Sequence, residues 1–298
     1  MSRRLLVLGC GYVGAEVCRR APRAGWKALG VVRSKVSCER LKAEGLDVVS
    51  LDILKDDLDV LGKSFDAIVY ALSAGGGGDD AYRAAYAEGP ARIARWAERM
   101  GVKTLVLTSS TGVYRQDGEV DESSPAGGDG PSDQLVAGEQ AILQSTVSQR
   151  TVLRLGGLYG PGRHYLLDQL RRGERTVGGR VDHWINYLHR DDAAEAILAA
   201  CVAPVGQHVL NVTDGHPLTK ESLAQWICHR LGGAPVTFDA AAPAGPRAQR
   251  SSRVQPNRIV HSRRIRTELG WKPLYSDVRK GLEPIITGLS APPSEASS

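Results

Sequence analysis

The glycine pattern near the start of the chain restricts the possible fold more than any other feature. Gly9, Gly11 and Gly14 form a G-x-G-x-x-G motif directly after a short apolar run that begins at Arg3. The first glycine permits a tight turn, the second lets the backbone approach a pyrophosphate, and the third lets the following helix pack closely on the strand. Free amides at the start of such a helix attract phosphate. The motif therefore predicts a dinucleotide-binding strand, turn and helix.

Strand and helix patterns alternate through the first half of the chain. Apolar runs predict strands over 3–9, 27–32, 46–51, 66–72, 102–109 and 151–155. Helices are expected between most of them, including 12–24 and 80–100. Such alternation is typical of a parallel sheet with helices on both faces. We therefore expect an α/β fold, a doubly wound parallel Rossmann sheet with a smaller C-terminal substrate lobe.

The weaker alternation of the second half predicts that it is shared between the sheet and the smaller lobe. We assign residues 1–160 and 187–212 to the dinucleotide-binding Rossmann domain. We assign residues 161–186 and 213–289 to the substrate lobe. The Ser-, Pro- and Ala-rich residues 290–298 predict a disordered tail.

Composition excludes several classes of protein. The 298 residues carry a net charge of +5 without a long Lys/Arg run, which argues against a nucleic-acid partner. Five cysteines, none at C-x-x-C spacing, predict reduced thiols and no metal site. No apolar stretch approaches the roughly 20 residues that span a bilayer, and no signal-peptide pattern precedes the first strand. We expect a cytoplasmic protein with no membrane partner. The stretch 232–256, rich in Ala, Pro, Gly and Arg, predicts an irregular loop.

The residues after the second predicted strand favour NADP over NAD. An acid at this position would accept a hydrogen bond from the ribose 2′-hydroxyl of NAD. This chain has Arg33 and Ser34 instead, and the next acid is Glu39. An arginine can hold a 2′-phosphate and stack on adenine, although it can also be an ordinary surface residue. We expect NADP as the cofactor, with NAD as the less favoured alternative.

Further cofactor contacts are expected where other strands end. Asp52, after the third strand, is placed either to contact the adenine amino group or to cap a turn. Ala71, Leu72 and Ser73 end the fourth strand and should line the cofactor cleft. The expected cofactor-binding residues are Gly9, Gly11, Tyr12, Val13, Gly14, Arg33, Ser34, Asp52, Ala71, Leu72, Ser73 and Ser109.

Four later segments carry a family resemblance. They are 108–114 (TSSTGVY), 155–163 (LGGLYGPGR), 187–193 (YLHRDDA) and 268–273 (ELGWKP). Together with the glycine turn, in this order and at these intervals, they resemble the extended, atypical short-chain dehydrogenases/reductases, the superfamily of nucleotide-sugar epimerases and dehydratases. The resemblance covers nearly the whole chain. It implies a nicotinamide cofactor, a small-molecule substrate and a homodimer formed through helices.

The family's acid/base pair is missing from this chain. The resemblance implies a tyrosine with a lysine four residues later, which holds the nicotinamide ribose and lowers the tyrosine pKa. Counted from the segment 137–140 (AGEQ), the lysine position falls on Leu135 and the tyrosine position near Pro131. No tyrosine in the sequence has a lysine four residues later. Any chemistry must therefore use other groups.

Three residues remain as candidates for catalysis, each with a structural alternative. The resemblance places Ser110 where a serine orients the substrate oxygen, although Ser110 can also simply cap the strand end. Tyr114 could reach the cleft or pack against the neighbouring loop. Tyr159 follows the sixth predicted strand, near the expected nicotinamide site, where Pro161 and Gly162 favour a fixed turn and a structural tyrosine.

Other polar side chains could contact a substrate. His164 and His183 could donate a proton near neutral pH, or lie in surface loops. His189 and Asp192 lie in a segment that, by the resemblance, ties the small lobe to the sheet. Four arginines are candidates either for an anionic substrate or for a solvated surface: Arg154, Arg163, Arg180 and Arg258.

Three hypotheses for function follow. The favoured one is an NADP(H)-dependent oxidoreductase acting on a small-molecule carbonyl or imine bound between the lobes, because hydride transfer is the cofactor's own chemistry. The second is a nucleotide-sugar epimerase or dehydratase with a displaced acid. The third is a non-catalytic NADP(H)-binding sensor or partner-binding protein.

Overall fold

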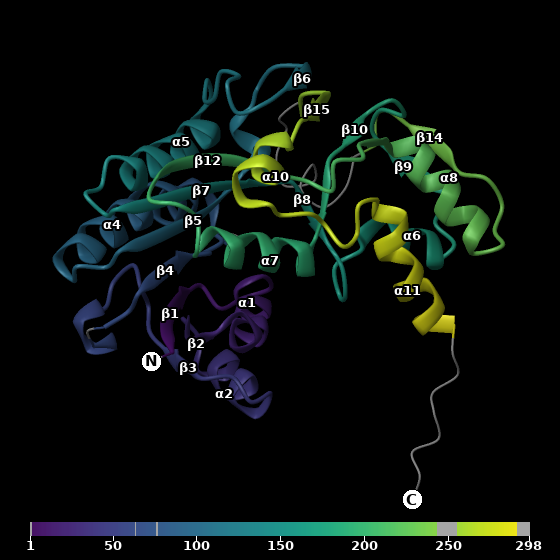
Figure 1. The fold of residues 1–298 in the computed structure, drawn as a ribbon. Coiled ribbons are helices and arrows are strands. Elements are labelled where there is room, and N and C mark those ends of the chain that lie inside the picture. Colours follow the sequence, from purple (N-terminus) through teal and green to yellow (C-terminus); the bar gives the residue numbers. More distant parts are fainter. Residues whose placement is uncertain (1, 63, 76, 243–254, 291–298) are drawn as a thin grey trace, which may run out of the picture.

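A seven-stranded parallel sheet forms the centre of the computed structural model, which describes residues 2–62, 64–75, 77–242 and 255–290. The strand order is β12-β7-β5-β4-β1-β2-β3, so the chain runs outward from β1 and then outward again from β4 (Figure 1). This order confirms the predicted doubly wound parallel sheet. The strands are β1 (Arg3–Leu8), β2 (Trp26–Val32), β3 (Val48–Ser50), β4 (Ala67–Tyr70), β5 (Thr104–Ser110), β7 (Gln149–Leu155) and β12 (Gly206–Val212).

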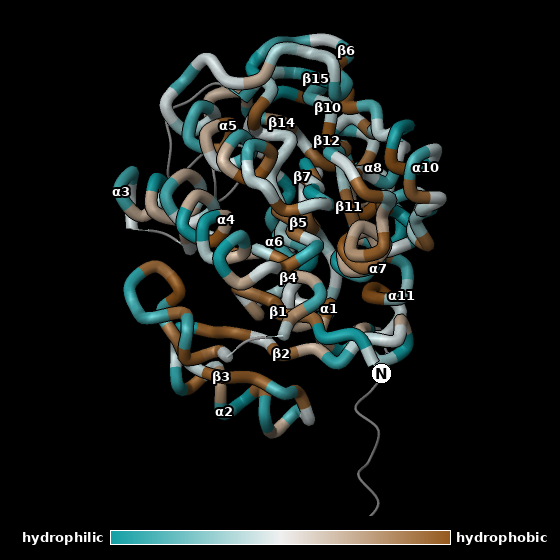
Figure 2. Tube along the Cα trace, turned by 60° about the vertical axis from the view of Figure 1, so that its left-hand side comes forward, coloured by the Kyte–Doolittle hydropathy of each residue, from teal (hydrophilic) through white to brown (hydrophobic). Residues whose placement is uncertain are grey.

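Helices cover both faces of the sheet because successive side chains of a strand point to opposite sides. In β1, Leu5 and Val7 join one apolar core, while Leu6 and Leu8 join the other. α1, α2 and α7 pack on the first core, and α4 and α5 on the second. Figure 2 shows the apolar strands between these helices. The helices are α1 (Gly14–Arg20), α2 (Lys35–Ala43), α4 (Gly89–Arg99), α5 (Gly130–Leu143) and α7 (Arg190–Ala200).

The single helix expected over 80–100 is interrupted in the structure. α3 (Gly78–Arg83) is followed by a π-helical turn, η3 (Ala84–Glu88), before α4 begins. Pro90, in the first turn of α4, has no N–H to donate to the preceding turn, so the regular hydrogen-bond ladder cannot continue through it. A proline thus divides a segment whose apolar pattern is continuous.

A smaller lobe surrounds its own apolar core beside the sheet (Figure 1). Side chains from α6, α8 and α11, such as Leu167, Ile227 and Leu282, fill this core. The elements of residues 161–186 and 213–289 that build this part are α6 (Tyr165–Arg171), β9 (Thr176–Gly178), β10 (Trp184–Ile185), β13 (Leu218–Thr219), α8 (Lys220–Arg230), β14 (Thr237–Asp239) and α11 (Val278–Ser290). β8 (Gly157–Tyr159) and β11 (Tyr187–His189), which fall in the ranges assigned to the Rossmann domain, pair with each other in parallel.

Two expectations for the C-terminal third are corrected. The stretch 232–256, expected to be irregular, contains β14, which pairs in parallel with β9. That partner lies far away in the sequence, so local composition could not indicate it. α11 extends to Ser290, which was assigned to the disordered tail. Residues 243–254 and 291–298 of these two segments lie outside the described residues.

Two polar residues at the start of α7 hold this region together: Asp192 binds the segment before α11, and His189 caps α7 itself. Asp192, in α7, accepts hydrogen bonds from the backbone N–H groups of Leu274 at 2.7 Å and Tyr275 at 3.0 Å. His189 caps α7 by accepting from the Asp191 N–H at 3.2 Å. Burial lowers the pKa of His189 to about 4, which keeps its ring neutral and able to accept.

Short elements bridge the sheet and the lobe. β15 pairs in parallel with β6, so a segment near the C-terminus lies beside the loop that follows β5. These elements are η1 (Ala21–Ala24), η2 (Leu58–Leu61), η4 (Thr111–Val113), β6 (Gly118–Val120), β15 (Arg258–Val260) and α10 (Arg263–Leu269).

Two further searches of the described residues bear on function. None of the helices found there is both long and apolar enough to cross a membrane. The same residues include no group of three or more His, Cys, Asp or Glu side chains placed to hold a metal ion. All five cysteines are buried free thiols.

Candidate functional site

The glycine turn between β1 and α1 has the geometry that a dinucleotide diphosphate requires. Gly9 has a φ of 95°, a left-handed conformation that side chains disfavour. A Cβ on Gly14 would lie 2.3 Å from the Gly9 carbonyl oxygen, so the contact needs glycine. A Cβ on Gly11 would meet nothing within 4 Å, which leaves the front of the turn open to a ligand. The turn therefore fits a nicotinamide dinucleotide, with its diphosphate on the backbone amides.

Tyr12 connects this turn to the loop that follows β8. Its hydroxyl donates to the Pro161 carbonyl oxygen at 3.2 Å. The guanidinium groups of Arg163 and Arg190 lie 5.5 and 5.6 Å from the centre of its ring. Val13, by contrast, is buried in the core beneath the turn. Of these two predicted cofactor-binding residues, Tyr12 is thus the one at the mouth of the site.

The end of β4 lies against the glycine turn. A Cβ on Gly9 would lie 2.7 Å from backbone atoms of Ala71 and Leu72. The Ala71 N–H donates to the Leu8 carbonyl oxygen at 2.8 Å. The structure therefore brings the start of the predicted segment 71–73 beside the predicted diphosphate site.

The residues predicted to contact the adenosine end lie after β2 and β3. Arg33 is exposed, and its carbonyl oxygen accepts from the Ser50 hydroxyl at 3.1 Å. The hydroxyl of Ser34 caps α2 by accepting a backbone N–H of the first turn at 3.3 Å. The Asp52 carboxylate accepts from the Leu54 N–H at 3.1 Å and so helps to form its own turn. Ser34 and Asp52 thus use their side chains in local turns, whereas the exposed Arg33 side chain follows β2, where the adenosine ribose is expected.

A buried polar network occupies the ends of β5 and β7. The Arg154 Nη2 lies 2.7 Å from Glu139 Oε2, and both side chains are buried. Glu139 also accepts from the Ser109 hydroxyl at 2.5 Å. The Tyr114 hydroxyl accepts from Arg154 at 2.9 Å and donates to Asn211 Oδ1 at 2.8 Å. Burial raises the pKa of Tyr114, opposite to the shift that an acid/base tyrosine needs.

This network engages two of the predicted site residues through their side chains. Ser109, expected beside the cofactor, directs its hydroxyl to α5, and Tyr114 has both a donor and an acceptor in the interior. Sequence reasoning missed Glu139 and Asn211 as their partners. The one available signal was Arg154, a charged residue within the apolar run of β7, which needs a carboxylate partner when it is buried.

Tyr159 is also buried, in the core of the smaller lobe. Its hydroxyl has no hydrogen-bond partner among the described residues. A Cβ on Gly281 would lie 2.1 Å from that hydroxyl, so α11 packs directly on it. Burial, together with the nearby carboxylates of Asp214 and Asp192, raises the pKa of Tyr159. Its surroundings favour the protonated phenol within a packed core.

Leu135 stands where the family resemblance implies a lysine. It lies in α5 and is buried in an apolar cluster with Val113, Tyr114 and Val260. Ser110 lies nearby at the end of β5, where its hydroxyl accepts the Gly112 N–H at 3.0 Å and caps η4. Apolar packing therefore surrounds the place of a family acid/base pair, and Ser110 is half-buried at its edge.

Of the candidate histidines and arginines, His183, Arg180 and Arg258 lie near one another, and the others lie apart from them. His164 Nδ1 lies 2.9 Å from the Asp168 carboxylate at the start of α6. Burial, with the charges of Lys220 and Arg258, lowers the pKa of His183, which favours a neutral ring. The arginines lie in four different surroundings: Arg154 in the buried network, Arg163 over Tyr12, Arg180 in an exposed ion pair and Arg258 beside η4.

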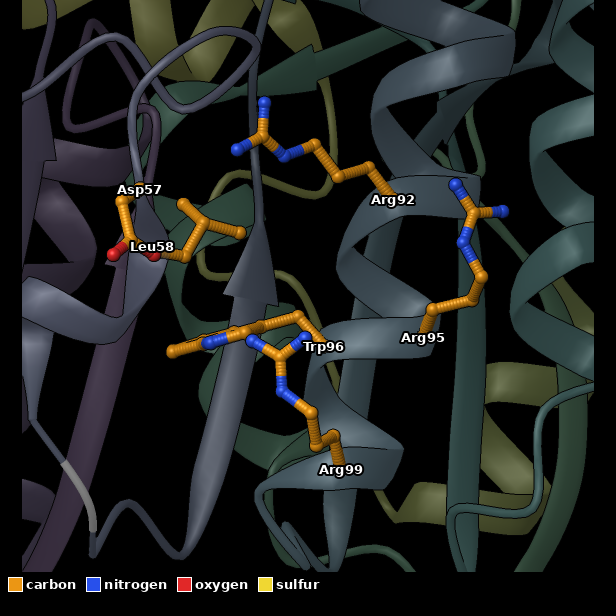
Figure 3. A pocket seen from close by; sticks show the side chains of 6 residues that line it. All are labelled: Asp57, Leu58, Arg92, Arg95, Trp96 and Arg99. Atoms are coloured by element: carbon orange, nitrogen blue, oxygen red, sulfur yellow. The ribbon is translucent and has the colours of Figure 1, made fainter.

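A surface hollow lies away from these residues, between η2 and α4 (Figure 3). Its Trp96 belongs to the core on the face of the sheet opposite α1. The Trp96 Nε1 and the Arg99 guanidinium bind Asp59 Oδ1 at 2.9 and 2.6 Å. The lining residues are Asp57, Leu58, Arg92, Arg95, Trp96 and Arg99. None of them is among the predicted site residues.

Fold and glycine turn together define a Rossmann-type protein with a dinucleotide site. Residues 5–213 match the profile of the NAD dependent epimerase/dehydratase family. The chain therefore belongs to that family, which confirms the resemblance to extended short-chain dehydrogenases/reductases.

Particular relatives agree with this assignment. The chain is 27% identical to Protein YeeZ of Escherichia coli (strain K12) over 286 residues, which cover 92% of this chain and 97% of that protein. It is 31% identical to a Streptomyces sp 3-diazoavenalumate denitrifying reductase over 214 residues, which cover 65% of this chain and 69% of that enzyme.

A solved structure agrees in fold. The UDP-Glucuronic acid 4-epimerase of Bacillus cereus, in complex with UDP-Glucuronic acid and NAD, superposes with a TM-score of 0.78 at 17% identity. The match covers 96% of this chain and 99% of that one.

The buried ion pair generates a stability prediction. Glu139→Gln leaves the Arg154 guanidinium buried without a carboxylate, so we expect the free energy of unfolding to fall by about 3–5 kcal/mol. Urea denaturation measures the change. Glu88→Gln is the matched control, because Glu88 pairs with Arg83 on the surface and should cost about 0–1 kcal/mol. Equal losses in both variants would contradict the assigned role.

Asp214, which follows β12, generates a pH prediction. Burial, with the nearby Asp277 carboxylate, raises the pKa of Asp214 from its ordinary value of 3.8 to about 7. Its Oδ1 accepts from the His216 N–H at 2.9 Å, while its Oδ2 has no partner among the described residues. The folded state therefore holds this proton more tightly than the unfolded state does. The stabilisation is complete below the ordinary value and is lost as the pH rises through about 7.

Asp214→Asn removes this proton linkage. Relative to the unmodified chain, we expect the variant to gain on the order of 2 kcal/mol in unfolding free energy at pH about 8 and little at pH about 4. Denaturant unfolding across that pH range measures the difference. Asp239→Asn, at an exposed carboxylate, serves as the control. A pH-independent difference between Asp214→Asn and the unmodified chain contradicts the linkage.

Proposed function

We propose that this protein is an NADP(H)-dependent oxidoreductase that acts on a small-molecule carbonyl or imine held between the Rossmann sheet and the smaller lobe. The observation that carries the proposal is a combination of two features. The dinucleotide turn keeps the geometry of all three glycines. Leu135 replaces the lysine of the family's acid/base pair within an apolar cluster. The cofactor site is thus retained while the usual proton machinery is not.

The residues of this chain bind the cofactor and orient the substrate, and its candidate tyrosines do not transfer protons. The cofactor, when bound, supplies or accepts a hydride, and the turn at Gly9, Gly11 and Gly14 holds its diphosphate. Ser110, half-buried at the end of β5, is the hydroxyl best placed to orient a substrate oxygen or nitrogen. The Tyr114 and Tyr159 phenols stay protonated in the interior, where they stabilise packing.

Such a site suits a substrate that needs little acid assistance. A simple alcohol must lose a proton as its hydride leaves, which normally requires a tuned general base. An activated carbonyl or a protonated imine already carries the positive character that draws a hydride. The alkoxide formed from a carbonyl then takes its proton from solvent water, whereas a protonated imine gives a neutral amine directly. Reduction is therefore easier here than oxidation of an alcohol.

One relative supports a reductase over an epimerase. The Streptomyces protein with 31% identity is described as a reductase. The Bacillus cereus epimerase is similar at 17% identity, a level that speaks for fold alone. Epimerisation through a transient ketone also needs a group that removes and returns a hydroxyl proton. Leu135 occupies the position on α5 where the family resemblance implies a lysine, and its apolar side chain cannot move a proton.

Arg33 supports NADP as the preferred cofactor, although the family description and the epimerase complex name NAD. Its side chain is exposed directly after β2, and Ser34 caps the helix that follows. A guanidinium there can pair with a 2′-phosphate through two parallel hydrogen bonds.

Arg33→Ala tests this preference. We expect the dissociation constant for NADPH to rise about tenfold or more, because a charge-assisted pair is lost, and that for NADH to stay within about twofold. Fluorescence titration with each cofactor measures both constants. Arg23→Ala, at another exposed arginine, controls for the general positive field. Equal effects on NADPH and NADH would remove the basis for NADP.

Turnover tests the reaction itself. We expect the protein to oxidise NADPH in the presence of an activated carbonyl or cyclic imine, and not to interconvert nucleotide-sugar epimers. The fall in nicotinamide absorbance measures the first reaction, and chromatography of UDP-sugars measures the second. Tight NADPH binding without turnover on either panel would favour a non-catalytic sensor. Epimer interconversion would favour a displaced acid.

A further inference from the structure

Arg258 differs from the other arginines that the sequence singled out. Its Nη2 donates to the Thr111 carbonyl oxygen at 3.1 Å. Its Nη1 is buried and has no hydrogen-bond acceptor among the described residues. In the part of the chain that the structure describes, no carboxylate forms an ion pair with the Arg258 guanidinium, and the Thr111 carbonyl oxygen is the one acceptor of its hydrogen bonds. Arg258 is half-buried, and within the described ranges its buried Nη1 has neither an acceptor nor a counter-ion, which is costly, so the arrangement calls for an explanation.

The backbone around Arg258 is held from two sides. Asn257 fixes the residue before it: its N–H donates to the Asp117 carboxylate at 2.7 Å, and its Oδ1 accepts the Trp184 N–H at 2.7 Å. Asn186 fixes Arg258 itself, because its side-chain amide donates to the Arg258 carbonyl oxygen at 2.9 Å. The backbone at Arg258 is therefore fixed, and the hydrogen bond to Thr111 holds its guanidinium, as a ligand-binding group requires.

The charged groups around Arg258 leave an excess of positive charge. Burial, together with the nearby Arg115 guanidinium, lowers the pKa of Arg258 to about 10. Arg115 pairs with Asp129 at 2.7 Å, so its own charge is balanced. The charge of the nearby Asp117 carboxylate partly offsets that of Arg258, although the hydrogen bond that Asp117 accepts comes from the Asn257 backbone N–H and not from the guanidinium.

The neighbouring elements do not supply the missing negative charge. Lys220, the first residue of α8, is buried and donates to the Gly178 carbonyl oxygen. Its charge and that of Arg258 both act on the half-buried His183. The sequence between 243 and 254, which precedes β15, contains three arginines and neither Asp nor Glu. Among the described residues, Lys220 thus adds to the positive charge near His183 and Arg258.

The position of Arg258 relates this charge to the reaction site. Thr111, which accepts its hydrogen bond, directly follows Ser110 at the carboxyl end of β5. In a doubly wound sheet, ligands bind outside the carboxyl ends of the strands, near the switch point between β1 and β4. A group bound to Arg258 would lie beside Ser110, at the reacting end of the substrate.

We propose that Arg258 binds an oxyanion, a carboxylate or a phosphate, on the reacting part of the substrate and so makes the enzyme selective for anionic substrates. The inference rests on the proposed function for its choice of cleft. A planar guanidinium offers two parallel N–H donors to such a group, and the unsatisfied Nη1 supplies a donor for it. Binding would remove the cost of the isolated charge.

The binding test uses the full-length protein with saturating NADPH in low-chloride buffer, and three probes. Benzoate presents a carboxylate, phenyl phosphate presents a phosphate, and benzamide is the neutral control. We expect at least one of the two anions to bind in calorimetry and to raise the melting temperature, and benzamide to do neither. A preference for benzoate or for phenyl phosphate identifies which oxyanion the substrate carries.

Three variants locate the site. Arg258→Met should weaken anion binding about tenfold or more. Arg258→Lys keeps the charge but loses the two parallel N–H donors, so its anion affinity should lie between those of the unmodified chain and Arg258→Met. Arg263→Met is the matched control, since it removes the same charge from an exposed position and should bind normally. Arg258→Met should also raise the melting temperature of the anion-free protein, because it removes an uncompensated buried charge.

Each outcome decides the inference. Anion binding that is lost in Arg258→Met and kept in Arg263→Met supports it. If Arg258→Met does not fold, weaker binding by Arg258→Lys supports it, and unchanged binding overturns it. The inference is also overturned if the unmodified chain binds neither anion, or if Arg258→Met binds them as tightly as the unmodified chain does. Normal NADPH binding and turnover with no anion binding would leave the proposed function intact, whereas failure to bind NADPH would remove the proposed function itself.

Discussion

The buried ion pair between Glu139 and Arg154 is the interaction on which the functional edge of the sheet depends. It joins α5 to β7, and the Ser109 hydroxyl extends it to β5. Tyr114 and Asn211 extend it further, to η4 and β12. Two opposite charges can be buried together only when their remaining hydrogen-bonding groups are also satisfied. Here the groups that satisfy them come from β5, β12 and the turn after β5, so the pair holds the ends of these strands together.

This arrangement explains how the family fold can persist without its usual proton machinery. The tyrosine closest to the end of β5 is committed to the network, and Leu135 packs where a lysine would stand. The dinucleotide turn is independent of both, because it depends on backbone conformation at Gly9 and close approach at Gly14. Cofactor binding and acid/base catalysis are therefore separable in this architecture. A chain that loses the second can keep hydride chemistry.

Two arginines at this edge of the sheet, the buried Arg154 and the half-buried Arg258, differ in how their charge is compensated. Arg154 has a carboxylate partner and a complete set of hydrogen bonds, so it contributes to a rigid interior. Arg258 has one backbone acceptor and an unsatisfied Nη1, so its charge remains available to a ligand. Arg154 thus contributes to the packing of the strand ends, and Arg258 is the residue that we propose binds an anion.

The sequence by itself determined the Rossmann sheet, its cofactor turn and its family. Short apolar runs and the glycine spacing are local signals, which can be read directly from neighbouring residues. Local signals could not determine that β14 pairs with β9, or that Pro90 divides a continuous apolar pattern with a π-turn. Nor could they show that Arg154 is balanced by a carboxylate from a distant segment.

Tertiary structure decided the roles of individual polar side chains. Tyr114 and Ser110 are close in sequence, yet one is enclosed by Arg154 and Asn211 while the other stays at the edge of the cleft. Burial and the identity of neighbours from distant segments fix whether a group is charged, bonded or free. Those neighbours meet only when the chain folds, which is why the sequence gives the positions of candidate groups and the fold decides their chemistry.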